Sequence, residues 1–367
     1  MRLIIMQCCV MMQSCHCHGN LPASVLTWNR MHATTATHCR NFAVFAGSAM
    51  LLLLGLPSLK SHVQDTAVDI SMAGLLLVMA KAFLKFLPLM LALLVELSLA
   101  PEKRLFCARL FKWQKSRRID LYSFILSHMH RVHAILNMAF TFGIPILLDR
   151  LIKNSMPRNF SLFALLERHA GYALAVLAFV FVATFFNYWE HRLWHSRILW
   201  PIHRFHHSAT DYNALTETRK HFTETLLTPL FFTLPLSLLG APLEFVATYL
   251  ALILFQGFMN HTDQGISYGW IGRHLWIDPL YHKLHHSSAA EHMNMNFSGT
   301  LPLWDRLFGT YAPAHGELAV GVSGAPHYDT LPYWKIHLRD FSDLLINLGT
   351  ALKDKLGRRG SIGRGGN

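Results

Sequence analysis

Two short stretches of this 367-residue chain repeat the same arrangement of histidines. His203 to Ser208 reads HRFHHS, and Tyr281 to Ser288 reads YHKLHHSS. In both stretches the three histidines are spaced i, i+3, i+4, which places them on one face of a helix. Chance is a poor explanation, because the chain has only 24 histidines to fall into one spacing twice. The repeat indicates that the two stretches share a chemical task.

Further histidines lie at the ends of apolar runs. His191 and His195 in EHRLWH are four residues apart and follow such a run, so a helix continuing past it would carry both on one face. His261, in NHTD, closes another apolar run. Nine imidazoles are therefore expected to converge near helix ends: His191, His195, His203, His206, His207, His261, His282, His285 and His286.

The chemistry that such a cluster performs is metal binding. Neutral imidazole is a ligand for iron, zinc, copper or nickel, and one ion takes about four to six donors. Nine donors exceed the needs of one ion and suit two. His221, in RKHFTE, is expected either to orient a ligand or to be a tenth ligand, with Glu224 nearby in sequence to orient His221 itself. The alternative is that these histidines are separate surface or interfacial residues without a shared role. Three sets that each lie on one helical face argue against this alternative.

The elements that must position these histidines are membrane helices. Hydrophobic residues make up 52% of the chain and charged residues 15%, with a mean hydropathy of +0.27. The long apolar runs are Phe42 to Leu59, Ile70 to Ala100, Ala134 to Leu148, Gly171 to Asn187, and Leu226 to Phe258, which breaks at Gly240 to Pro242. A spanning helix needs about 20 apolar residues. We predict an all-α membrane bundle of about four to six membrane helices with a histidine-rich cap.

The net charge of +12 is concentrated behind the second apolar run. Seven basic residues crowd that loop: Lys103, Arg104, Arg109, Lys112, Lys115, Arg117 and Arg118. The positive-inside rule places the loop, and the histidines with it, on the cytoplasmic face of a bacterial inner membrane or of the endoplasmic reticulum. Nucleic acid is the competing polyanion, but the sequence has no zinc-finger spacing, helix-turn-helix pattern or RNA-binding motif. The membrane is the favoured partner.

The histidine sets also carry a family resemblance. The order HRLWH, HRFHH, NH and HKLHH, followed by NFSGTLPLWDRLFGTY from Asn296 to Tyr311, resembles the fatty acid hydroxylase and sterol desaturase superfamily. The resemblance covers about Gly171 to Ala312. It implies that the nine histidines bind two non-haem irons on the cytoplasmic side. It also implies that the chain uses O2 and electrons to hydroxylate or desaturate a C–H bond of a fatty acyl, sterol or related lipid.

By the same resemblance, no catalytic residue beyond the metal ligands is expected. The candidates for residues that support the ligands are His221, Glu224, Asn296 and Asp305. For Asp305, which lies in the closing motif, a role in a turn or helix cap is the favoured alternative to shaping the site.

The electrons are expected from another protein, because the chain has no Gly-x-Gly-x-x-Gly signature, Walker loop or haem motif. A ferredoxin or small b-type cytochrome, with its reductase, fits this role. The basic face near Arg192, Arg197 and Arg204, together with the loop from Lys103 to Arg118, is predicted to receive it.

Three other functions compete with the oxygenase. A histidine-rich membrane metal transporter or binding protein would place polar residues at mid-membrane depth, whereas these histidines cluster at helix ends. A haem electron carrier needs only one facing histidine pair per haem, which the close triplets fit poorly. A non-catalytic member of the superfamily would keep the ligands without the reaction.

The chain divides into four predicted regions. Residues 1–40 are expected to be a disordered extension that carries five of the six cysteines, and residues 41–168 a membrane anchor containing the basic loop 101–118. Residues 169–312 form the predicted catalytic domain. Residues 313–367 are a tail, with an amphipathic helix from Phe341 to Leu352 and a flexible Gly-rich and basic end beyond about 353.

Overall fold

A computed structural model describes residues 36–48, 72–99, 114–129, 135–137, 139–153, 161–263, 266–314, 318–325 and 327–362. Over these residues the predicted all-α architecture is confirmed, with one isolated bridge between Ser287 and Val320. A helix spans residues 36–48, so it begins within the predicted extension, whose first 35 residues lie outside the described ranges. Most of the basic loop 101–118 also lies outside them, and Lys115 is the first residue of a helix.

Three described helices are long and apolar enough to cross a membrane. The first is Ile135–Ile152, which overlaps α7 (Ile144–Lys153). The other two are α9 (Tyr172–Trp194) and α12 (Leu243–Asn260). Two apolar helices are shorter: α11 (Phe222–Leu238) and the Phe86–Leu99 part of α3 (Met72–Leu99). At a rise of 1.5 Å per residue, α11 is about 26 Å long, which falls short of the ~30 Å hydrocarbon core. Within the described ranges three helices are long enough to span, and most of the predicted apolar run from Phe42 to Leu59 lies outside those ranges.

The predicted break in the apolar run from Leu226 to Phe258 separates two helices. Helix α11 ends at Leu238, and Pro242 is the N-cap of α12. Gly240 between them has φ +80°, and a Cβ atom there would lie 2.3 Å from Ser161 Oγ, so the turn requires glycine. Ser161 donates to the Gly240 carbonyl (3.2 Å) and caps α8 (Leu162–Ala170), which joins the turn to the start of α9.

The membrane helices pack through apolar side chains that α9 and α12 contribute. Phe179 of α9 lies edge-on against Phe245 of α12, with ring centroids 5.9 Å apart, and Ala183 packs in the same cluster. A second cluster joins α12 to α3 through Phe255 and Leu89. Helix α12 is therefore held from two sides, which fixes the position of its C-terminal end.

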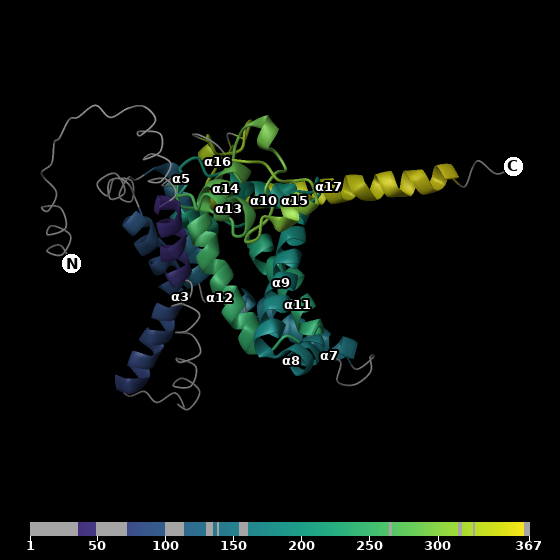
Figure 1. Cartoon of the computed structure of the whole chain (residues 1–367). Coiled ribbons are helices and arrows are strands. Elements are labelled where there is room, and N and C mark those ends of the chain that lie inside the picture. The colour runs from purple at the N-terminus through teal and green to yellow at the C-terminus, as the bar shows by residue number, and fades with distance from the viewer. Residues whose placement is uncertain are drawn as a thin grey trace, which may run out of the picture.

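Short helices form a cap at one end of α9 and α12 (Figure 1). They are α10 (Trp200–His207), η2 (Ala214–Thr218), α13 (Trp270–His274), α14 (Pro279–His285), η3 (Ala290–His292), α15 (Leu303–Leu307) and α16 (His327–Thr330). Helix α5 (Lys115–Met129) packs against η2, and α17 (Tyr333–Ile362) packs against α10. Helix α17 then extends away from the cap, across the direction of α9, α11 and α12 (Figure 1).

Helix α17 is much longer than the helix predicted from Phe341 to Leu352. Its first turns pack onto the cap through Ile336 and Asp340, both fully buried, which the isolated sequence pattern did not indicate. Its end continues to Ile362, through residues predicted to be flexible, among which Lys355, Leu356 and Arg358 are good helix formers.

Candidate metal centre

The nine predicted histidines all meet in the cap, and all are brought there by helix ends. His191 lies in the last turn of α9, and His195 is its C-cap. His261 is the C-cap of α12, and His286 is the C-cap of α14. The remaining members lie on short helices: His203, His206 and His207 on α10, and His282 and His285 on α14.

Local sequence explains why the two short histidine helices begin where they do. Pro201 occupies the first turn of α10, and Pro279 the first turn of α14, where a missing N–H costs no hydrogen bond. Asp278 caps α14 by accepting from Tyr281 N (2.9 Å). Both triplets therefore present one helical face, as the spacing predicted.

The nine side chains form two groups whose donor atoms lie within 4.8 Å of one another. The first group is His191, His195, His203, His207 and His285, and the second is His206, His261, His282 and His286. The groups are adjacent, because the His206 and His207 rings lie 5.6 Å apart and the His285 and His286 rings 5.5 Å apart. The arrangement is that of two neighbouring sites, with five and four imidazoles.

Hydrogen bonds fix the orientation of five of these rings. The Nδ1–H groups donate to protein oxygens: His191 to Phe297 O (2.7 Å), His203 to Glu224 Oε1 (3.0 Å), His206 to Arg219 O (3.2 Å), His261 to Gly257 O (2.7 Å) and His285 to Met295 O (2.8 Å). In a neutral imidazole this assigns the proton to Nδ1 and leaves a lone pair on Nε2. Each Nε2 is thus available as a ligand.

The Nε2 atoms are spaced as the donors of one ion would be. His191 and His203 bring theirs within 3.2 Å, and His261 lies 3.3 Å from His206 and 3.2 Å from His286. Two nitrogens about 2.1 Å from a shared ion are about 3.0 Å apart at an octahedral angle and about 3.4 Å at a tetrahedral one. Facing lone pairs repel unless a cation lies between them, so the donor set fits metal ions.

Burial keeps these imidazoles neutral. Removal from water lowers the pKa of His285 and of His261 to about 4, and neighbouring imidazoles add to the effect at His285. The same causes hold the pKa of His207 and His282 well below the usual value. Around pH 7 the cluster therefore presents unprotonated nitrogens, which is the form that binds metal.

Glu224 contacts the histidine cluster at His203, and not at His221, the residue that the sequence predicts it to orient. Its carboxylate is buried and accepts the Nδ1–H of His203, which holds that ring in place and raises the basicity of Nε2. We expect Glu224→Gln to weaken metal affinity about 10–100-fold, because the neutral amide is a poorer acceptor. Metal retention during titration with a chelator measures this, with exposed Glu291→Gln as the matched control. Equal retention by the two variants would contradict the role.

Asp305 and Asn296 act through the loop that follows η3. Buried Asp305 accepts from the backbone N–H of Phe297 (2.8 Å) and Ser298 (2.7 Å), and so positions the Phe297 carbonyl that His191 binds. Asn296 has φ +58° and donates to the carbonyls of Tyr281 and Ala312. Asp305 therefore stabilises a turn, as favoured from the sequence, and the same hydrogen bonds position the carbonyl that binds His191.

His221 lies outside both histidine groups. It is the N-cap of α11: its Nδ1 accepts from Thr223 N (3.2 Å), and its Nε2–H donates to the carbonyl of His337 on α17 (3.0 Å). Both ring nitrogens serve the backbone, so the side chain positions α11 and α17. The geometry agrees with a supporting residue and not with a tenth ligand.

His221 and His337 give the fold a dependence on pH. Burial lowers the pKa of His221 to about 4 and that of His337 to about 3, whereas both titrate near 6.5 when unfolded. Protons then bind the unfolded chain first, so stability is complete above pH 6.5 and falls by about 1.4 kcal/mol per unit and per histidine below it.

Between pH 7 and pH 5 the free energy of unfolding of the wild type should fall by about 2 kcal/mol more than that of His337→Phe, because the variant lacks one of the two titrating histidines. Thermal unfolding in detergent at both pH values measures the difference. Exposed His274→Phe should follow the wild type. Parallel losses for His337→Phe and His274→Phe would refute the prediction.

A small cavity of about 130 Å³ adjoins the histidines, and charged side chains line it. Glu190 accepts from Thr228 Oγ1 (2.8 Å) and from the Trp194 indole, and Glu217 pairs with Lys220. The other carboxylate oxygen of Glu217 lies 3.3 Å from His261 Nδ1. Sequence reasoning missed these residues. The only signal was the placement of Glu190 directly before His191.

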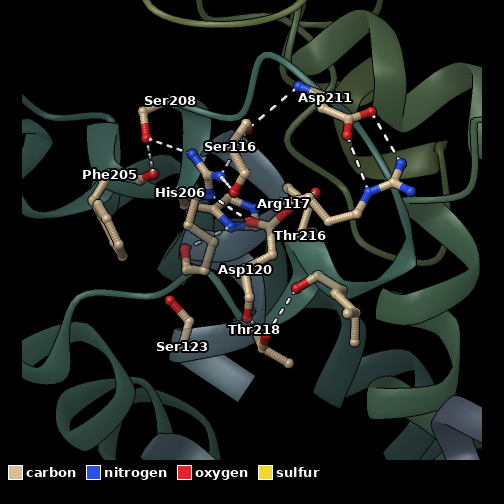
Figure 2. A network of polar contacts seen from close by, with 12 residues as sticks. Ser116, Arg117, Asp120, Ser123, Phe205, His206, Ser208, Asp211, Thr216 and Thr218 are labelled. Atoms are coloured by element: carbon tan, nitrogen blue, oxygen red, sulfur yellow. Dashed lines mark hydrogen bonds and ion pairs between the residues drawn. The ribbon is translucent and has the colours of Figure 1, made fainter. Parts of the chain in front are cut away.

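A buried ion pair anchors the segment between α10 and α11, and this was also missed. Arg219 and Asp120 are 1% and 0% exposed and pair directly, and Arg219 also binds Ser208 Oγ (3.1 Å) and Ser116. Figure 2 shows Ser116, Asp120 and Ser208 gathered around this guanidinium, beside His206. Because His206 donates to the Arg219 carbonyl, the network ties the metal centre to α5.

Part of the predicted basic face is neutralised within the chain. Arg204 pairs with Asp340 and Asp343 of α17, and Arg117 with Asp211 (3.1 Å). These arginines, which the sequence predicts to bind an electron-donor protein, therefore pair with carboxylates of the chain itself. The stretch from Lys103 to Lys112 lies outside the described residues.

Comparison with known proteins shows which family the residues around this site resemble. Residues 176–310 match the family model for fatty acid hydroxylase, and these residues include all nine histidines. The chain is 32% identical over 139 residues to alkylglycerol monooxygenase of Xenopus tropicalis, which covers 37% of this chain and 30% of that protein. It is 32% identical over 155 residues to an ornithine lipid hydroxylase of Rhizobium tropici, which covers 41% and 46% respectively.

The likeness is confined to this part of each chain. The matched segment spans less than half the length of these curated relatives. A third relative, alkylglycerol monooxygenase of Danio rerio, is 34% identical over 137 residues, or 37% of this chain and 30% of that protein. The comparison with solved structures found no match.

Proposed function

We propose that the chain belongs to the fatty acid hydroxylase superfamily, whose family model matches residues 176–310, and that it is a membrane-bound non-haem di-iron oxygenase that hydroxylates a C–H bond of a lipid. The observation that carries this proposal is the convergence of nine imidazole donors in two groups at the end of membrane-type helices. Nitrogen donors suit iron, and two groups suit two ions.

Two irons, when bound, supply the O2-dependent oxidation of an unactivated C–H bond. The five histidines around His203 hold one ion and the four around His261 hold the other. Glu224 and the carbonyls of Phe297, Gly257 and Met295 keep the rings in the ligating tautomer. Burial of the cluster limits the access of water, which protects the reaction from side products.

We assign a lipid substrate with a polar end. The relatives are named for alkylglycerol and for ornithine lipid, which both join an apolar chain to a polar group. Hydroxylation is preferred to desaturation because the relatives are named hydroxylases and monooxygenases.

The orientation and the electron donor follow from charge. We place the cap on the cytoplasmic face, where the basic residues before α5 would contact anionic headgroups. A ferredoxin or small b-type cytochrome with its reductase would supply the electrons. Since Arg204 and Arg117 are paired internally, Arg197 and Arg192 carry the docking role in this proposal.

The test is lipid profiling of membranes that contain the full chain. We expect products with one added oxygen atom that derives from isotopically labelled O2, and none from a chain carrying His206→Ala with His285→Ala. Metal content is measured on the same preparations. Protein that retains metal but leaves every lipid unchanged, in the presence of ferredoxin or cytochrome with reductase, would support the metal-binding or non-catalytic alternative.

A further inference from the structure

A second cavity, of about 510 Å³, lies where α5 and the starts of α11 and α17 meet. This volume lies within the range of about 300–1,000 Å³ that is usual for small-molecule sites. The buried residues that line it are polar: Ser123, Thr218 and His337. The exposed residues that line it are apolar: Leu126, Leu136, Phe222, Trp334 and Leu338. The cavity therefore has a polar floor and an apolar mouth.

The floor contains an imidazole that lacks a hydrogen-bond partner. His337 is only 8% exposed, and neither ring nitrogen is hydrogen-bonded. Its ring packs between Phe205 and Tyr333, with centroids 4.7 and 4.6 Å away. A buried polar group without a partner is costly, and a neutral imidazole can both donate and accept. A hydroxyl group in the cavity can bind one of these nitrogens, either as a donor to the unprotonated nitrogen or as an acceptor from the protonated one.

The mouth opens on an apolar surface of α17. Trp334, Leu338, Leu345, Leu348 and Leu352 recur on one face of this helix and are 38–61% exposed. The helix runs across the membrane-type helices α9 and α12 (Figure 1), which is the orientation of an amphipathic helix in the plane of the membrane interface. In that orientation the mouth of the cavity, which Trp334 and Leu338 also line, would face the lipid.

The inner end of the cavity reaches the metal centre through one side chain. Lys220 lines both this cavity and the smaller one beside the histidines. It pairs with Glu217, which contacts His261. Lys220 is the one lining residue that the two cavities share, so a movement of its flexible side chain away from Glu217 would open the path between them.

We propose that this cavity binds the hydroxyl-bearing polar end of a membrane lipid, whose hydrocarbon chain leaves through the mouth over Leu338 and Trp334. His337 and the hydroxyl groups of Ser123, Thr218 and Tyr333 bind the polar end. The carbon that reaches the histidines past Lys220 is then close to the polar end and not in the middle of the chain. This last step rests on the proposed oxygenase function, whereas the binding does not.

The binding is tested with the purified full chain in detergent. The probe is a monoacylglycerol with a brominated chain, which quenches Trp334 fluorescence, and the Trp334→Phe variant supplies the background. We expect unlabelled monoacylglycerol to compete and an alkane of equal length not to compete. His337→Phe should raise the Kd about fivefold, since it removes one hydrogen bond and keeps the ring. Exposed His274→Phe is the matched control.

A second variant, Leu338→Asp, changes the mouth at an exposed position and should also raise the Kd. An unchanged Kd in His337→Phe and Leu338→Asp, or equal competition by the alkane, overturns the proposal. Metal content separates the two proposals. Wild-type protein that binds monoacylglycerol but no metal refutes the oxygenase and leaves this site. Metal-loaded protein that prefers no hydroxyl-bearing lipid refutes this site and leaves the oxygenase.

Discussion

Purified protein that carries both His206→Ala and His285→Ala is expected to contain almost no iron, against about two irons per chain in the wild type. The two substitutions remove one donor from each group. Since both side chains are buried, water has little access to replace the lost nitrogen. Lipid oxidation should fall with the metal, to the background of membranes without the protein.

The two single variants test each histidine group separately. His206→Ala removes a donor of the four-histidine group and His285→Ala one of the five-histidine group, so each should lose mainly one ion. Elemental analysis gives the metal content, and circular dichroism shows that the helices remain. His274→Ala, at an exposed position, is the control. Full iron content in the double variant would show that the groups are not metal sites.

Arg219→Met is expected to lower the free energy of unfolding by about 3–5 kcal/mol. The substitution leaves the Asp120 carboxylate buried and unpaired, at a position with no exposed surface. Asp120→Leu in the same chain should recover part of the loss, because it removes the orphaned charge. Denaturant unfolding in detergent measures both variants.

A more exposed ion pair provides the comparison. Lys283 and Asp263 are 19% and 29% exposed, so Lys283→Met should cost no more than about 1 kcal/mol. If Arg219→Met were no more harmful than Lys283→Met, the buried network would not be the anchor of the cap. Because His206 binds the Arg219 carbonyl, the Arg219 variant should also hold its metal more weakly.

The convergence of the nine histidines was predictable because the information for it is local. The spacing i, i+3, i+4 in His203 to His207 and in His282 to His286 fixes one helical face, and apolar runs before His191 and His261 locate the helix ends. The charged partners were not predictable. Arg219 and Asp120 are 99 residues apart, and no periodicity links them.

The same distinction applies to the fold. The break at Gly240 was evident, because glycine and proline interrupt an apolar run. The length of α17 was not evident, because its first turns are held by Asp340 against Arg204, on an element more than 130 residues earlier. The composition of a helix indicates whether it lies in a membrane or in water. The extent of α17 also depends on contacts with residues far away in the sequence, such as that between Asp340 and Arg204.

The charged residues that line the small cavity beside the histidines would affect how metal ions bind there. Imidazole ligands carry no negative charge, so two divalent ions held by nine of them would bring four positive charges into a region of low dielectric constant. Glu190, Glu217 and Glu224 supply three carboxylates beside them, with one lysine. In the apoprotein, Lys220 is the one lysine or arginine in this lining that faces the three carboxylates. The ions would therefore act as structural neutralisers as well as reagents, and iron supply would set how much folded protein accumulates.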